Sequence, residues 1–89
     1  MAVCMIFDAP GATQAQYEQV LQEVTADGPP QGVRSHVAGP TESGWCVVEV
    51  WDSKEAFDRF FADKLRQALQ RANLNGQPRF FEVANTMQP

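Results

Sequence analysis

The 89-residue sequence contains few of the residues that build metal centres, disulfide frameworks or polyanion-binding surfaces. It has two cysteines, Cys4 and Cys46, too far apart for a CxxC motif, and a single histidine, so we expect no bound metal and no disulfide. Its 7 basic and 11 acidic residues give a net charge of −4, the wrong sign for phosphate backbones or anionic lipid. We therefore expect neither nucleic acid nor a membrane among its partners.

The N-terminal residues also lack the pattern of a targeting segment. The run 1–7 is mostly apolar but has no basic residue, and Asp8, Pro10 and Gly11 follow at once. This pattern fits neither a signal peptide nor a transmembrane helix. We expect a cytoplasmic protein whose two thiols are reduced and lie within strands.

Several familiar catalytic motifs are missing as well. The sequence has no glycine-rich phosphate loop, no EF-hand loop and no Ser-His-Asp order, so we expect no cofactor. The composition is that of an ordinary globular protein, 44% hydrophobic and 20% charged, and the length fits one domain spanning residues 1–89. A domain of this size buries only about 60–65% of the surface of its unfolded chain, so a partner subunit would add useful burial.

The hydrophobic periodicity predicts alternating strands and helices. Thr13 and Gln16 form a capping box, and apolar residues then recur at the spacing of a helix that packs on a sheet. Asp52 or Ser53 begins a second helix, which ends at 75–76 before a proline. The strands are predicted at 2–7, 32–38, 45–51 and 79–84, with a turn at 39–44 and a polar tail at 85–89. The apolar faces are Tyr17, Val20, Leu21 and Val24 in the first helix, and Phe57, Phe60, Phe61, Leu65, Ala68, Leu69 and Ala72 in the second.

This order, β-α-β-β-α-β, is that of the ferredoxin-like fold in the α+β class. In this fold two helices cover one face of a four-stranded antiparallel sheet, and the other face has no cover of its own. The alternation of side chains in the two central strands predicts what each face carries. One face holds Arg34, His36, Trp45, Val47, Glu49 and Trp51, and the other holds Val33, Ser35, Val37, Cys46, Val48 and Val50. Because the second set is nearly all apolar, we expect a second copy of the chain to cover it as a homodimer.

The polar and aromatic face is the candidate ligand site. Opposing Ala38 to Trp45 places Arg34 opposite Glu49, so these two either form a cross-strand ion pair or contact a substrate, and both roles can coexist. His36 can act as a general base at neutral pH, or it can simply hydrogen-bond a neighbour in the core. A pocket lined by aromatic side chains with a few polar groups is typical of a small-molecule site.

The two tryptophans cannot share one stacking platform, because six strand residues separate them by roughly 20 Å. We expect Trp51 rather than Trp45 to line the pocket, although core packing would also explain its position. Tyr17, Phe57 and Phe61 follow helical spacing and either fill the core or line the cavity. In the last strand the alternation leaves open whether Arg79 or Phe81 faces the pocket.

The segment VVEVWDSKEAF, residues 47–57, resembles the antibiotic biosynthesis monooxygenase family of dimeric α/β-barrel proteins. It is a strand that ends in tryptophan, followed by an acidic-Ser-x-Glu-Ala-Phe helix start, and the order of elements extends the resemblance over nearly the whole chain. The resemblance implies two ferredoxin-like subunits joined through their sheets, each with a pocket between sheet and helices. The family's strand-end tryptophan faces that pocket, and its match here is Trp51.

The resemblance also implies a class of chemistry. The family includes cofactor-independent oxygenases of phenolic polyketides and haem-degrading enzymes, but the haem-binding branch has a histidine on the second helix, and this chain has none between Ser53 and Asn75. The cofactor-free branch needs a base, a group that stabilises an anion, and a dry cavity. The candidates are His36 as base, Glu49 to orient it, and Arg34 or the indole of Trp51 as stabiliser.

The expected function is therefore binding of a small aromatic or polyketide-like molecule, with cofactor-independent monooxygenation as the candidate reaction. Tyr17, Phe57 and Phe61 would join Arg34 and Trp51 in holding the substrate. Two alternatives stay open: a non-enzymatic ligand-binding or stress-response protein, and a cyclase or isomerase that uses His36 for proton transfer alone.

Overall fold

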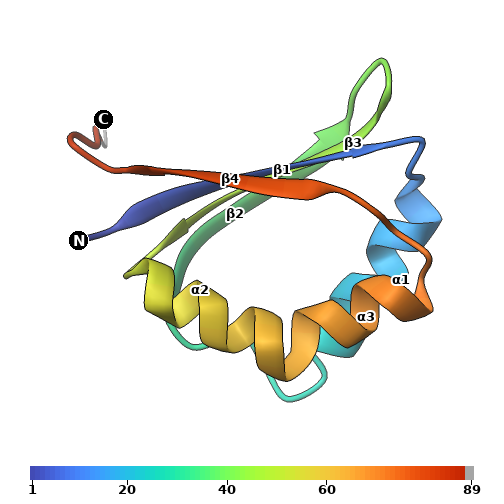
Figure 1. Ribbon diagram of the computed structural model, residues 1–89, viewed down its shortest axis with the longest axis horizontal. Helices are drawn as coiled ribbons and strands as arrows, with labels where there is room; N and C mark the ends of the chain where they lie inside the picture. The colour runs from blue at the N-terminus through green and yellow to red at the C-terminus, as the bar shows by residue number, and fades with distance from the viewer. Residues whose placement is uncertain (88–89) are drawn as a thin grey trace.

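The computed structural model describes residues 1–87 and contains one antiparallel sheet with all of its helices on one side (Figure 1). The order of elements along the chain is β-α-β-β-α-β, which confirms the predicted fold class. Hydrogen-bonded neighbours in the sheet follow the order β2-β3-β1-β4, so the two central strands are β3 and β1. The strands are β1 (Val3–Pro10), β2 (Val33–Pro40), β3 (Gly44–Trp51) and β4 (Gln77–Glu82).

The first helix, α1 (Gln14–Val24), begins at the predicted capping box. The hydroxyl of Thr13 accepts a hydrogen bond from the backbone N–H of Gln16 at 3.2 Å, and the side chain of Gln16 accepts one from the N–H of Thr13 at 2.9 Å. These two bonds satisfy backbone donors that the helix itself leaves free. None of the described helices combines the length and the hydropathy needed to cross a membrane.

The second helical segment is less regular than the periodicity predicts. It begins at α2 (Lys54–Phe60), where the hydroxyl of Ser53 and not Asp52 caps the helix by accepting from the N–H of Ala56 at 3.1 Å. A π-helical turn, η1 (Phe61–Leu65), leads into α3 (Arg66–Arg71). The segment ends before the predicted Asn75-Gly76, because Asn73 adopts a positive φ of 54°. A π-turn adds one residue to the helical repeat and shifts the side chains that follow, and no residue type in the segment signals it.

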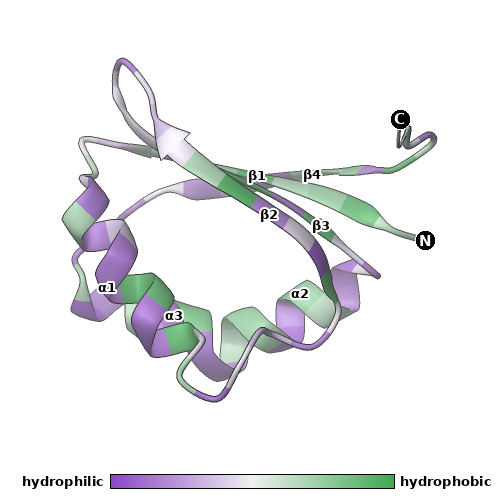
Figure 2. Ribbon diagram, turned by 180° about the vertical axis from the view of Figure 1, so that it is seen from behind, coloured by the Kyte–Doolittle hydropathy of each residue, from purple (hydrophilic) through white to green (hydrophobic). Residues whose placement is uncertain are grey.

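The hydrophobic core lies between the sheet and the helices. Alternate residues of β1 point toward the helices, which carry hydrophobic and hydrophilic residues side by side, as amphipathic helices do (Figure 2). Trp51, at the end of β3, is fully buried and packs edge-on against Phe57 at 5.5 Å between ring centroids. The buried core comprises Val3, Met5, Phe7, Ala9, Val20, Val24, Trp51, Phe57, Ala68, Ala72 and Leu74.

The pairing of β2 with β3 differs from the expected register by two residues. His36 lies opposite Glu49 and Ala38 opposite Val47, so the predicted pairing of Ala38 with Trp45 is wrong. The turn is shorter than expected, because Gly39 and Pro40 still belong to β2, an edge strand on which proline is tolerated. An even shift keeps each side chain on its predicted face, so His36 stays on the side of the helices.

Two further predictions are wrong because β2 contains a bulge at Arg34. Val33 pairs with Trp51 and Ser35 pairs with Val50, so Arg34 is the extra residue of β2. Val33 consequently packs against the core and not on the opposite face, where the alternation had placed it. The guanidinium of Arg34 points outward and pairs with Asp52 at 2.5 Å, so the expected Arg34–Glu49 ion pair does not form.

The last strand begins two residues earlier than predicted. Its register shows whether Arg79 or Phe81 faces the pocket, which the alternation left open. Phe80 lies opposite Met5 and packs against Phe57 on the side of the helices. Arg79 and Phe81 both lie on the other side, so neither faces the pocket. The predicted polar tail 85–89 has no regular structure at 85–87, and Gln88 and Pro89 lie outside the described residues.

The side of the sheet that faces away from the helices is an apolar surface, here named the outer sheet face. No other part of the described chain covers it in Figure 1. Val37 is 64% exposed and Phe81 is 55% exposed, which is unusual for side chains of this size. At one end of this face Asp8 pairs with Arg79 at 3.2 Å. Its apolar residues are Cys4, Ile6, Val37, Cys46, Val48, Val50 and Phe81.

The aromatic contacts of Phe57 generate a test of the core. Phe57 is 3% exposed and contacts both Trp51 and Phe80, so Phe57→Ala should lower the free energy of unfolding by about 3–5 kcal/mol. Arg59→Ala, an exposed change in the same helix, should alter it by less than about 0.5 kcal/mol. Urea unfolding at one fixed protein concentration measures both. Equal midpoints for the two variants would contradict this description of the core.

Candidate active site

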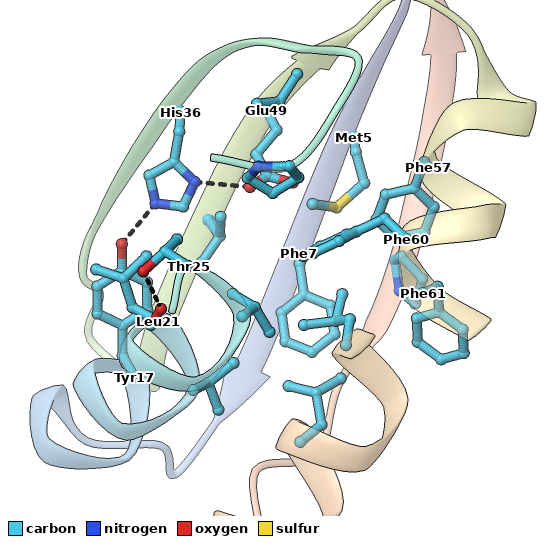
Figure 3. A pocket seen from close by; sticks show the side chains of 18 of the residues that line it. Met5, Phe7, Tyr17, Leu21, Thr25, His36, Glu49, Phe57, Phe60 and Phe61 are labelled. Atoms are coloured by element: carbon cyan, nitrogen blue, oxygen red, sulfur yellow. Dashed lines mark hydrogen bonds and ion pairs between the residues drawn. The ribbon is translucent and has the colours of Figure 1, made fainter. Parts of the chain in front are cut away.

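A cavity of about 380 Å³ lies between the sheet and the helices, a size typical of small-molecule sites (Figure 3). Nearly all of its lining is apolar. The side chains of Phe57, Phe60 and Phe61 form one side, and the polar side chains gather on the opposite side. The remaining apolar lining includes Met5, Phe7, Val20, Leu21, Val24, Val33, Val47, Leu65, Leu69 and Leu74.

The polar end of the cavity is a continuous chain of hydrogen bonds through four side chains. The hydroxyl of Tyr17 lies 2.5 Å from Nε2 of His36, and Nδ1 of His36 lies 2.6 Å from Oε2 of Glu49 (Figure 3). The indole Nε1 of Trp51 donates to the other carboxylate oxygen of Glu49 at 3.0 Å. We call these four residues the Tyr17–Trp51 chain.

The sheet register brings the members of this chain together. His36 and Glu49 are directly opposed in β2 and β3, and Glu49 and Trp51 are two residues apart on one strand, so all three share one face. Tyr17 comes from the first turns of α1, which crosses over that face. Its ring centroid lies 5.9 Å from that of the His36 imidazole, and the two ring planes are 21° apart.

The carboxylate of Glu49 fixes the protonation pattern of the neutral imidazole. Because an ionised carboxylate only accepts hydrogen bonds, Nδ1 of His36 carries the hydrogen and donates it to Glu49. Nε2 is then the acceptor, and the hydroxyl of Tyr17 donates to it. The side chain of Glu49 is 12% exposed and that of His36 is 33% exposed, so the pair is partly shielded from water.

The environment keeps Tyr17 in its neutral form. Burial, and secondly the negative charge of Glu49, raise the pKa of the Tyr17 phenol above its ordinary value of 10.0. At neutral pH the phenol is therefore a hydrogen-bond donor and not a base. Among the described residues that line the cavity there is no lysine or arginine, so Glu49 carries the one permanent charge of the lining.

Five of the seven predicted site residues lie in the lining of the cavity, and two do not. His36, Glu49, Tyr17, Phe57 and Phe61 line it. Arg34 does not line the cavity, because the bulge turns it toward Asp52 and more than half of its side chain is exposed. Trp51 is on the expected side of the sheet but is buried behind Phe57 and Phe60, and it contacts the site only through its bond to Glu49.

Trp45 lines the cavity although we expected Trp51 to do so. The ring of Trp45 lies 5.2 Å from that of Tyr17, because α1 covers the end of β3 at which Trp45 stands. Its indole Nε1 is buried and has no hydrogen-bond partner among the described residues. The alternation of β3 places Trp45 on the correct face, but only the position of α1 shows which tryptophan meets the cavity.

The described residues contain no group of three or more His, Cys, Asp or Glu side chains that could hold a metal ion. The site consists of the hydrogen-bonded Tyr17–Trp51 chain at the polar end of an apolar cavity. The arrangement can bind a mostly apolar molecule and exchange one proton with it.

Known structures share this architecture over nearly the full length of the chain. SnoaB, a cofactor-independent oxygenase from Streptomyces nogalater, is 16% identical, with 99% of this chain and 96% of that chain covered and a TM-score of 0.64. A candidate antibiotic biosynthesis monooxygenase from Deinococcus radiodurans is 15% identical, with 100% and 98% covered and a TM-score of 0.69. A candidate monooxygenase from Shewanella loihica is 22% identical, with 96% of each chain covered and a TM-score of 0.65.

No family model and no curated protein sequence matches the chain. The solved structures define a class, α+β domains of the antibiotic biosynthesis monooxygenase type, and this chain has their fold. The resemblance seen in the segment 47–57 is thus confirmed at the level of the fold.

Tyr17 is the only tyrosine of the chain, so its ionisation can be followed without ambiguity. Because the Glu49 charge helps to raise its pKa, Glu49→Gln should lower the pKa of Tyr17, while burial keeps it above the ordinary value. The measurement is tyrosinate absorbance during an alkaline titration. Glu42→Gln, an exposed change in the β2–β3 turn, should leave the curve unchanged.

The same shift has a consequence for stability. Since the folded-state pKa lies above the unfolded one, the stabilisation from protonated Tyr17 is complete below pH 10 and is lost as pH rises through the folded-state pKa. Glu49→Gln should move that loss to lower pH. Superimposable titration curves for Glu49→Gln and the wild type would refute the coupling between Glu49 and Tyr17.

Proposed function

We propose that the protein is a cofactor-independent monooxygenase of a hydroxylated aromatic compound. The observation that carries the proposal is the shielded His36–Glu49 pair, which ends in an apolar cavity and is coupled to Tyr17. The known fold relatives include SnoaB, itself named as a cofactor-independent oxygenase, and this supports the reaction class.

The proposed reaction depends on a base and requires no cofactor. Removal of a proton from an electron-rich aromatic substrate gives an anion that can pass electrons to O₂. For an anthrone, the ring CH₂ becomes C=O, one oxygen atom enters the substrate, and the other leaves as water with both hydrogens of that carbon. The substrate is the reductant and O₂ the oxidant, so atoms and electrons balance.

The residues at the polar end suit the first step of that reaction. His36 is the base of the site, and Glu49 orients its ring and stabilises the imidazolium that forms. The apolar lining excludes water, which strengthens the interaction between the imidazolium and the substrate anion. Arg34 has no part in this scheme, since it pairs with Asp52 outside the cavity.

A cyclase or isomerase is the second candidate, because the same His36–Glu49 pair would transfer a proton without O₂. Oxygen consumption separates the two. A non-enzymatic binding protein would use the same cavity but would need no buried carboxylate beside the histidine, and the desolvation cost of Glu49 favours an active role for the pair.

The prediction for the reaction uses anthrone as the probe substrate and an oxygen electrode as the detector. Wild-type protein should consume O₂ in the presence of anthrone, and His36→Gln should slow the reaction by about 10²- to 10⁴-fold, the usual contribution of a general base. Arg34→Ala is the matched control and should retain the wild-type rate. Uptake by wild type and His36→Gln at equal rates would remove His36 from the mechanism, and no uptake by either protein would argue against an oxygenase.

We also propose that two copies of the chain pack through the outer sheet face. Val37 and Phe81 are apolar side chains that are more than half exposed, as is common at interaction sites, and the flanking Ile6, Val48 and Val50 continue the same apolar strip. A two-fold axis through this face would bury the strip against its own copy. Val33, which we first assigned to this interface, is excluded from it because it packs in the core.

The cysteines suit a reducing compartment, and we place the protein in the cytoplasm. Cys4 and Cys46 are both free. Burial, and secondly a hydrogen bond to Asp8, raise the pKa of the Cys46 thiol, so this thiol stays protonated and weakly nucleophilic at neutral pH.

Val37→Glu tests the interface without disturbing the core, since this side chain is 64% exposed in the single subunit. We expect the wild type to sediment as a dimer and Val37→Glu as a folded monomer with an unchanged circular dichroism spectrum, because two charged side chains would be buried at the interface. Gln19→Glu, on an exposed part of α1, is the control and should remain dimeric. A monomeric wild type at micromolar concentration would contradict the proposal.

A further inference from the structure

Nε2, the nitrogen of His36 that can accept a proton, is not free to contact a ligand in the cavity. Nδ1 is engaged with Glu49, and Nε2 is covered by the hydroxyl of Tyr17 at 2.5 Å. A nitrogen of this kind has a single lone pair in the ring plane, and the hydroxyl occupies it. A substrate that needs His36 must therefore displace Tyr17 or exchange its proton through the oxygen of Tyr17.

Displacement is disfavoured by the packing of Tyr17. Its ring is partly buried and lies 5.2 Å from the ring of Trp45, so moving it would disrupt an aromatic contact as well as a short hydrogen bond. Passage through the phenol oxygen requires no rearrangement of the site. The oxygen has a free lone pair beside the cavity that Tyr17 lines.

We propose that Tyr17 is the residue that contacts the acidic proton of the substrate, and that it relays this proton to His36. The proposal rests on the proposed function and specifies its first step. In that step the acidic bond of the substrate breaks, C–H in an anthrone or O–H in a phenol, and a new O–H bond forms at Oη of Tyr17, while the original phenol proton of Tyr17 moves to Nε2 of His36. The substrate becomes an anion, His36 becomes an imidazolium, and Tyr17 is neutral before and after the transfer.

The charges that face the relay favour this direction of transfer. From β3, the carboxylate of Glu49 stabilises a positive charge on His36 of β2, and the same carboxylate opposes a negative charge on Tyr17 of α1. A tyrosinate base is therefore disfavoured and a neutral relay is favoured. Removing Tyr17 should thus disconnect the base from the cavity and not merely weaken a hydrogen bond.

The relay also defines the class of substrate. The described lining contains no cationic side chain, so a second anionic group on the ligand, such as a carboxylate, would be buried without a partner. Toward the ligand, the polar end supplies one acceptor, the oxygen of Tyr17 whose hydrogen is donated to His36, and one developing positive charge, on His36. The site fits an aromatic molecule with one weakly acidic hydroxyl and an otherwise apolar body.

The test uses a chromogenic phenol, 4-nitrophenol, whose absorption differs between its neutral and ionised forms. With the wild type, the bound probe should ionise at lower pH than the free probe. His36→Gln and Tyr17→Phe should both abolish this shift, and Ser43→Ala, which removes an exposed hydroxyl in the β2–β3 turn, should preserve it. If Tyr17→Phe still ionises the probe as the wild type does, His36 acts directly and the relay is wrong; the same holds if the wild type does not shift the probe.

A second measurement separates a relay from a structural role for Tyr17. His36 is the only histidine, so its imidazole proton signal in an NMR titration is unambiguous. In Tyr17→Phe, adding the probe should no longer shift this signal toward the imidazolium position, as it should in the wild type. A probe-induced shift equal to that of the wild type would overturn the proposal.

Neither measurement requires O₂. Ionisation of the probe without oxygen uptake on anthrone would refute the oxygenase and keep the relay, and oxygen uptake by Tyr17→Phe at the wild-type rate would refute the relay and keep the oxygenase.

Discussion

The contact between His36 and Glu49 is the interaction on which both the site and its surroundings depend. A carboxylate that is nearly buried is costly unless donors replace its lost water, and here His36 and Trp51 each supply one. Because the two donors come from β2 and from the end of β3, satisfying Glu49 also holds the edge strand in register. Through its hydrogen bond to His36, Tyr17 connects α1 to the His36–Glu49 pair. Loss of the carboxylate would disturb a strand pairing, a core tryptophan and a helix together.

The cavity lowers the stability of the domain, because side chains do not fill it. An 89-residue domain has little apolar surface to bury. Its side chains leave a volume of about 380 Å³ beside the core, and the contacts that packed side chains would make there are lost. The aromatic residues of α2 and η1 form one side of the opening, so the core keeps large contacts with Trp51 while leaving space for a ligand. A bound aromatic molecule would restore part of the missing packing, which couples ligand affinity to stability.

The sequence predicts the elements and the two faces of the sheet because these depend on local periodicity. It does not predict the pairing partners of individual residues. The β2–β3 register differs from the expected one by two residues, which keeps His36 on its predicted face and places it, instead of Arg34, opposite Glu49. The bulge at Arg34 and the π-turn at Phe61–Leu65 have no residue signature, and both depend on tertiary packing. The choice between Trp45 and Trp51 as the cavity residue likewise depends on where α1 crosses the sheet.

The alternation along β3 links the two proposed properties of the protein, its chemistry and its self-association. Glu49 points into the cavity, and its neighbours Val48 and Val50 point to the outer sheet face. A slip of β3 by one residue against its neighbours would therefore place the carboxylate of Glu49 in the proposed interface and a valine on the side of His36. Burial of the outer sheet face by a second copy would oppose such a slip. The wrong register would bury a charge in the interface and would remove apolar side chains from it. Dimerisation would thus help to hold the Tyr17–Trp51 chain in place, although the side chains of the proposed interface lie on the opposite side of the sheet.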